Sequence, residues 1–228
     1  MRTTTRRAAV LVAAGALGLS GLAAASAMAA ASPFAGHPVV AATPGPGWSD
    51  GMGSGYGKGG SAMMGIGARD GSCLEAPIAA AKGTLSEAQK TTLVAMAQEE
   101  KAAHDLYTAF AGKYDAIVFD RIAASEARHL TTVRTLLSRY GVADPTTGEP
   151  AGKFSDPAAQ ASYDTLLAQG QAGQAAALQV GVTVEQTDIA DLTAALGGLS
   201  APDVTQVYTQ LRMASQHHLA AFQNWSTR

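Results

Sequence analysis

The stretch VADPTTGEPAGKFSDPAAQASYDTLLAQGQ, residues 142–171, decides the fold, because it is a long connection between two helical segments. Within it, Asp156 and Pro157 are typical of a helix N-cap and first turn, so a short helix is predicted to begin there and to end at Gly170. Neighbouring antiparallel helices need only ~2–8 joining residues. The chain is therefore expected to cross from one end of its long helices to the other within this stretch.

On both sides of this connection, apolar residues recur at helical spacing, and no run alternates like a strand. Ser86 and Gln89 form the pattern of a capping box that opens the first long helix, and Gly141 follows the second. Long helices are predicted at about residues 86–114, 119–140, 173–196 and 202–225. The predicted fold class is all-α: a ferritin-like four-helix bundle whose long crossover carries a short extra helix between the second and third long helices.

The N-terminus has the three parts of a secretory signal. MRTTTRR is basic, AAVLVAAGALGLSGLAAA is apolar and ASAMAA supplies small residues for cleavage, so residues 1–29 are predicted to be a signal peptide. A retained membrane anchor is the alternative, although glycines interrupt the apolar run. The protein is expected to be secreted or extracytoplasmic, in the cell envelope, and the paired Arg6 and Arg7 leave the export route open.

Residues 30–82 are predicted to be a disordered linker rich in Gly, Pro and Met, which leaves residues 83–228 as the helical domain. Methionines of the linker are candidate soft ligands for Cu(I), although a flexible spacer is the simpler interpretation. Cys73, the single cysteine, has no partner for a disulfide within the chain.

Cleavage after residue 29 would leave 13 basic residues against 18 acidic ones, a net charge of −5. Such a balance makes no polybasic surface, so nucleic acid is not an expected partner. No membrane partner is expected after cleavage, and a homodimer is compatible with the sequence.

Each of the four long helices carries an acid or a histidine where its apolar stripe predicts burial. Burying ionised groups costs several kcal/mol each unless they are paired or bind a metal. Four carboxylates and two imidazoles make up the ligand set of a carboxylate-bridged dimetal site, so one or two ions of iron or manganese are the predicted cofactor. The six candidate metal ligands are Glu100 on the first helix, Glu126 and His129 on the second, Glu185 and Asp188 on the third, and His218 on the fourth.

The segments EEKAAHDLY, residues 99–107, and SEARHL, residues 125–130, resemble the first two metal-binding helices of rubrerythrin-type proteins. Residues 85–225 are similar as a whole to an uncharacterised ferritin-like family of bacteria and archaea, in stretches such as YGVADP, GKF, VEQTDIADL and SQHHLAAF. The resemblance implies a ferritin-like fold with a metal site. The ligands that it implies are Glu100 as a terminal carboxylate, Glu126 as a bridge, His129 as its partner, and Glu185 and His218 from the last two helices.

Position 215 departs from this resemblance, because Ser215 stands where rubrerythrins and ferritins place a second bridging Glu. Asp188 could replace that Glu, although its shorter side chain comes from a different helix. A single or asymmetric metal site is therefore an open alternative to a two-metal site. On the neighbouring positions, His104 is a candidate spare ligand, whereas His217 points about 100° away from His218 and is expected to be exposed.

Three functions fit these observations. The first is a redox metalloprotein that acts on oxygen or peroxide, and the second is an extracytoplasmic protein that binds or buffers metal without turnover. The third is a metal-free structural bundle, whose acids would pair with Arg121, Arg128 or Arg134. These arginines fall largely on outward positions, which favours the metal-binding interpretations and leaves open whether the protein is an enzyme.

Overall fold

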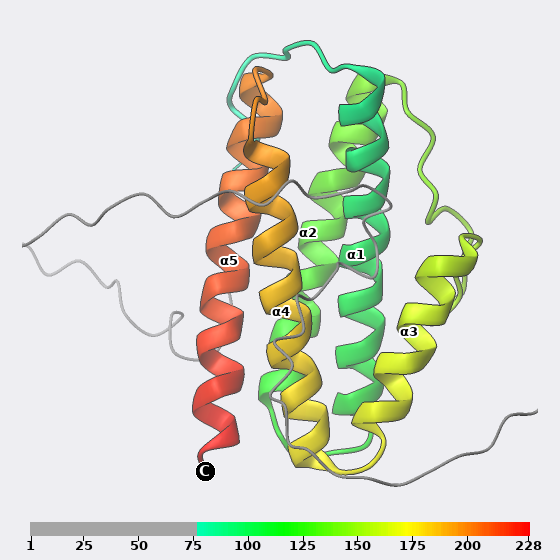
Figure 1. Cartoon of the computed structure of the whole chain (residues 1–228), viewed down its shortest axis with the longest axis vertical. Coiled ribbons are helices and arrows are strands. Elements are labelled where there is room, and N and C mark those ends of the chain that lie inside the picture. Colours follow the sequence, from blue (N-terminus) through cyan, green and yellow to red (C-terminus); the bar gives the residue numbers. More distant parts are fainter. Residues whose placement is uncertain (1–76) are drawn as a thin grey trace, which may run out of the picture. The chain divides into compact units, whose positions relative to one another are not determined.

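The computed structural model describes residues 77–228, in which all regular structure is helical and no strand occurs (Figure 1). The prediction of an all-α fold is thereby confirmed. The four long helices lie side by side, with α1 packed along α2 and α4 along α5, while the shorter α3 contacts α1 and α4. The helices are α1 Glu87–Ala111, α2 Val118–Tyr140, α3 Pro157–Gly170, α4 Gln174–Leu196 and α5 Pro202–Ser226.

The helix ends follow from local signals in the sequence. The Ser86 hydroxyl accepts a hydrogen bond from the Gln89 backbone N–H, and the Gln89 side chain accepts one from the Ser86 N–H, so the predicted capping box is confirmed. Gly141 ends α2 with φ of 65°, a left-handed conformation that glycine adopts without strain. Asp156 caps α3 by accepting from two backbone N–H groups, and Pro157 follows it in the first turn.

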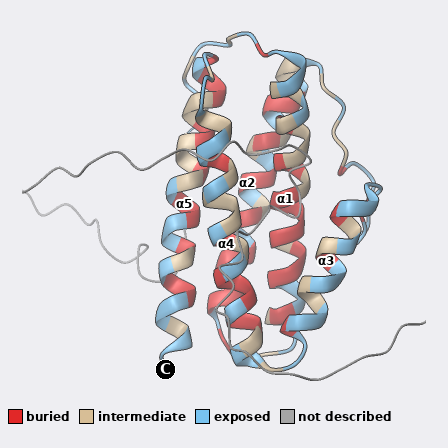
Figure 2. Ribbon diagram, viewed as in Figure 1, coloured by how far each residue is buried: buried red, intermediate tan, exposed pale blue. Residues whose placement is uncertain are grey.

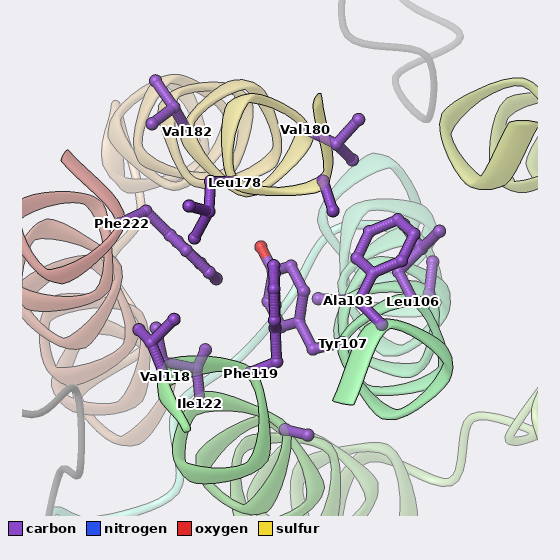
Figure 3. Packing of buried hydrophobic residues seen from close by; sticks show 14 of the residues in the cluster. Ala103, Leu106, Tyr107, Val118, Phe119, Ile122, Leu178, Val180, Val182 and Phe222 are labelled. Atoms are coloured by element: carbon purple, nitrogen blue, oxygen red, sulfur yellow. The ribbon is translucent and has the colours of Figure 1, made fainter. Parts of the chain in front are cut away.

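Two apolar clusters fill the interior between the long helices. The first includes Tyr107, Phe119 and Phe222, as Figure 3 shows, and the second includes Leu93 and Leu211. Figure 2 shows that the buried faces of the long helices turn toward one another. Along each long helix, buried polar residues separate the two clusters, and these residues are Glu99, Glu100, Ser125, Glu126, His129, Glu185, Ser215 and His218. We call this set the polar layer.

Close packing of α4 on α5 depends on Gly181. A Cβ atom at this position would lie 2.8 Å from the Phe222 ring, closer than two carbon atoms can approach without a shift. Gly170, at the end of α3, makes a similar contact, because a Cβ there would lie 2.1 Å from Cζ of Phe110. Both glycines therefore let an aromatic ring of the first cluster lie directly against a helix backbone.

The segment before α1 lies against α5. The side-chain oxygen of Gln206 accepts hydrogen bonds from the N–H groups of Ala79 and Ala80, and its side-chain N–H donates to the carbonyl of Pro77. The signal peptide and most of the linker that the sequence predicts lie outside the described residues. Within residues 77–228, the helices are all too short or too polar to cross a membrane.

The crossover between α2 and α3 is attached to α1 by a buried ion pair. Nζ of Lys101 lies 2.5 Å from Oδ2 of Asp105, and only 6 % of each side chain is exposed. The same Nζ donates to the carbonyl of Pro150 and lies over the ring of Phe154, while the Asp105 carboxylate accepts from the N–H of Gly152. The pair therefore joins α1 to the loop that carries the chain toward α3.

Replacing Asp105 with asparagine is expected to destabilise the fold by about 2 kcal/mol, since Lys101 would lose its buried counter-charge while the shape of the side chain is kept. The corresponding fall in melting temperature is about 4–8 °C for a domain of this size. Thermal unfolding followed by circular dichroism measures it, with Asp115→Asn in the exposed α1–α2 turn as the matched control. Equal melting temperatures for the two variants would contradict the role of the pair.

Candidate metal centre

Five of the six predicted metal ligands come together in the polar layer, where all four long helices meet. Since none of the five is more than 3 % exposed, their charges are held away from solvent. These side chains come from α1, α2, α4 and α5 and are Glu100, Glu126, His129, Glu185 and His218. The faces of the four helices that the sequence predicts to be buried thus meet at one location in the interior.

Glu126 lies at the centre of this group. Its Oε2 is 2.6 Å from Nδ1 of His129, one turn further along α2, and its Oε1 is 2.8 Å from Nδ1 of His218 on α5. The two imidazole rings are nearly parallel, with centroids 5.5 Å apart. One carboxylate therefore contacts both histidines, each through a different oxygen atom.

Glu100 and Glu185 complete two overlapping groups of three. Oε2 of Glu100 is 3.4 Å from Nδ1 of His129, and Oε2 of Glu185 is 3.6 Å from Nδ1 of His218. Glu100, Glu126 and His129 form the first triad, and Glu126, Glu185 and His218 form the second, with ligand atoms that lie within 4.8 Å of one another in each. Glu126 belongs to both triads.

Two hydroxyl groups hold acids of this region in place. The hydroxyl of Tyr107 donates to Oε1 of Glu185 at 2.7 Å, which leaves Oε2 of Glu185 toward His218. The hydroxyl of Ser215 donates to the carboxylate of Asp188, the sixth predicted ligand. Asp188 is half-buried and lies outside both triads. Ser215, which stands where the resemblance places a second bridging Glu, is thus hydrogen-bonded to Asp188, the acid that could replace that Glu.

Other polar residues considered in the sequence lie away from the triads. Nδ1 of His104 is 2.9 Å from the backbone carbonyl of Ala123, so this nitrogen is not available as a spare ligand. His217 is exposed, as its helical position predicts. Arg121 and Arg128 are exposed as well, and Arg134 forms an ion pair with Asp144 in the crossover.

Burial and the mutual charges of these groups shift their pKa values in opposite directions. Burial raises the pKa of Glu100 well above its usual range, although His129 opposes the shift. Burial alone would also raise the pKa of Glu126, but the two histidines beside it hold that pKa well below the usual range. The pKa of His129 is raised, because the carboxylates of Glu126 and Glu100 outweigh the effect of burial. Glu185 has a raised pKa through burial, which His218 partly offsets.

The donor set fits a hard, carboxylate-preferring metal ion such as iron or manganese. Two ligand atoms at about 2.1 Å from one ion, seen at a right angle, lie about 3 Å apart. The contacts of the triads, between 2.6 and 3.6 Å, span that distance. Oε1 of Glu100 is fully buried without a hydrogen-bond partner among the described residues, which is costly unless a cation or proton binds there.

Without metal, the protein is expected to lose stability as the pH rises from 5 to 8. The pKa of Asp188 is raised from 3.8 to about 7 by burial and by Glu185, so the folded state binds this proton more tightly than the unfolded state does. The stabilisation is complete below pH 4 and is lost as the pH passes through 7, and the raised pKa values of Glu100 and His129 act in the same direction. The lowered pKa of Glu126 matters only below its ordinary 4.5.

Melting temperatures of chelator-treated protein between pH 5 and pH 8 test this expectation, and added metal should flatten the profile because it replaces the protons. A metal-free protein that becomes more stable toward pH 8 would contradict it.

Two features of the site were not predicted from the sequence. Glu99 is buried although it lies about 100° from Glu100 around α1, because α1 contacts α2, α3 and α4 and therefore buries a wide arc. The hydrogen bond of Tyr107 to Glu185 joins residues 78 positions apart, and helical spacing does not reveal such a pair. The only signal for Tyr107 was its position on the same stripe as Glu100, seven residues earlier.

Comparison with known proteins places this chain in a family. Residues 89–225 match the family described as "Uncharacterized protein domain (DUF2202)", and the chain belongs to that family. The chain is 36 % identical over 141 residues to "Uncharacterized protein MJ0754" of Methanocaldococcus jannaschii, an alignment that covers 62 % of this chain and 76 % of the relative. It is also similar to the crystal structure of that hypothetical protein, with a TM-score of 0.63 and 34 % identity over 65 % of this chain and 85 % of the other.

Proposed function

We propose that this protein is an exported, ferritin-like metal-binding protein that holds one or two iron or manganese ions in the middle of a four-helix bundle. Bound iron or manganese would supply redox chemistry toward oxygen or peroxide. The position of Glu126 carries the proposal, since its two oxygens reach the histidines of two different triads. A carboxylate in that position is suited to bridge two ions.

The layout of the four long helices supports the ferritin-like part of the proposal. α1 and α2 are joined by a short turn and so are α4 and α5, whereas residues 141–173, which include α3, separate the two pairs. A four-helix bundle with one long crossover is the ferritin-like connection, and its metal sites lie in the bundle core on facing helices. The triads occupy the corresponding position here, between the two apolar clusters.

The chain's own residues would have three tasks at this site. The carboxylates of both triads would offset the charge of the ions, and the histidines would fix their positions. Tyr107 would keep one oxygen of Glu185 occupied, so that the other oxygen faces the ion. The apolar clusters on both sides would exclude water, which strengthens the electrostatic interactions within the layer.

Binding or buffering of metal without turnover is a second candidate, and Ser215 favours it. Ser215 donates to Asp188 and offers no carboxylate of its own, so the ligand set is asymmetric. An asymmetric site would hold one ion more tightly than the other, which suits storage of a single ion better than two-ion chemistry.

Elemental analysis of protein purified without added metal tests both candidates. Two equivalents of iron or manganese per chain, together with consumption of peroxide, would support the redox function. One tightly bound equivalent without turnover would support binding or buffering. If the protein contains no metal and binds none when iron(II) or manganese(II) is added, a structural helical protein remains and the proposal is wrong.

A further inference from the structure

Each triad contains one residue that is contacted by a hydroxyl group from outside the triads. In the second triad, the hydroxyl of Tyr107 donates to Oε1 of Glu185 at 2.7 Å. In the first triad, Nε2 of His129 lies 3.3 Å from Oγ of Ser125. Glu185 and His129 each belong to one triad only, whereas Glu126 belongs to both. The two hydroxyl groups therefore act on different triads.

The hydroxyl of Tyr107 is held in place by the packing of its ring. Tyr107 is fully buried in the first apolar cluster, and its ring centroid lies 5.0 Å from that of Phe222 (Figure 3). Phe222 in turn lies against the α4 backbone at Gly181, four residues before Glu185. Because the ring cannot turn away without disturbing this close packing, its hydroxyl stays directed at Glu185.

This hydrogen bond determines which oxygen of Glu185 faces the second triad. Since Oε1 is engaged by Tyr107, Oε2 is the atom that lies 3.6 Å from Nδ1 of His218. Without a partner for Oε1, the carboxylate would be free to rotate about its side-chain bonds, and an ion would have to immobilise it on binding. A ligand that is already held in one orientation avoids this entropic cost. Tyr107 therefore prepares the second triad for an ion.

Ser125 prepares the first triad through a histidine. Ser125 is fully buried on α2, one turn before His129. Nδ1 of His129 lies 2.6 Å from Oε2 of Glu126 and 3.4 Å from Oε2 of Glu100, so Nδ1 is the nitrogen turned toward an ion in this triad. The ring would then carry its proton on Nε2, which donates to Oγ of Ser125. This hydrogen bond fixes both the tautomer and the orientation of the ring.

We propose that Tyr107 and Ser125 are positioning residues for two separate ion positions, Tyr107 for the second triad and Ser125 for the first. The inference rests on the proposed function, because it concerns the ions that the triads would hold. It goes further by assigning the affinity of each position to a different hydroxyl group. Loss of a group that orients a metal ligand weakens binding by about 10–100-fold, so either position can be weakened while the other is kept.

Titration with manganese(II), followed through the electron paramagnetic resonance signal of the free ion, tests this assignment in two backgrounds. Glu185→Gln disables the second triad, so the ion that remains bound belongs to the first. In this background, Ser125→Ala should lower the affinity by about tenfold or more, whereas Tyr107→Phe should leave it unchanged. Glu100→Gln disables the first triad instead, and there the effects of the two substitutions should be exchanged. A general loss of packing would not produce this exchange.

Tyr208→Phe is the matched control, because Tyr208 is a buried tyrosine of α5 whose hydroxyl has no hydrogen-bond partner among residues 77–228. It should change the affinity in neither background, and melting temperatures check that each variant is folded. The inference is wrong if Tyr107→Phe and Ser125→Ala act alike in both backgrounds, or if either background binds no manganese(II). If the unsubstituted protein binds no manganese(II), the proposed function itself fails.

Discussion

Glu126→Gln is expected to lower the affinity for iron or manganese by about 100-fold or more, and to leave the purified protein nearly free of metal. Loss of a residue that only orients a ligand already weakens binding by about 10–100-fold, and Glu126 contacts the histidines of both triads directly. Glutamine retains the length of the side chain but removes its charge, so an ion held by either triad would lose a ligand. Metal content by elemental analysis, together with peroxide consumption, measures the effect.

Glu87→Gln provides the control for this experiment, because Glu87 is an exposed glutamate at the start of α1. The helical circular dichroism spectrum of both variants should match that of the wild type. If Glu126→Gln contains as much metal as the Glu87→Gln control, the triads do not hold the metal found in the purified protein.

Phe222→Ala is expected to destabilise the protein by about 3–5 kcal/mol, which corresponds to a fall in melting temperature of about 6–20 °C. The Phe222 ring is fully buried, and its centroid lies 5.0 Å from that of Tyr107 and 5.7 Å from that of Phe119. The ring also lies directly against the backbone of α4 at Gly181. A helix backbone cannot easily move in to fill the cavity that alanine would leave at position 222. In Figure 3, Phe222 projects from α5 into the space between the helices.

Met213→Ala is the matched control, since Met213 is on the same helix and is 52 % exposed. Its effect should stay within about 0.5 kcal/mol. Chemical denaturation of both variants gives the two free energies of unfolding. A loss below about 1 kcal/mol for Phe222→Ala would mean that the first apolar cluster is not packed as described.

Much of the fold could be predicted because its signals are local. The capping box at Ser86, the left-handed Gly141 and the pair Asp156–Pro157 each act within a few residues, so the helix boundaries are readable from the chain. The length of the segment between the second and third long helices indicated that the chain crosses there from one pair of long helices to the other, and does not make a short turn. Helical spacing then identified which side chains face inward, although it could not identify the helix that each one meets.

The less predictable features depend on contacts between distant parts of the chain. Lys101 and Asp105 have the spacing of an ordinary surface ion pair, and only the crossover that packs over them makes the pair buried. On a helix that packs on one side only, Glu99 would be exposed to solvent. It is buried because α1 contacts α2, α3 and α4 and so has a wide packed surface. The position of Asp188 beside Ser215, outside the triads, likewise depends on how α4 lies against α5.

The polar layer lies between two separate apolar clusters, so the four long helices are anchored to one another at two levels. Neither cluster needs the ionisable side chains in order to align the helices along their axes. Substitutions confined to the middle level are therefore expected to leave the relative register of the helices unchanged, even where they alter the metal binding that we propose. A chain organised in this way can change its chemistry without having to change its architecture.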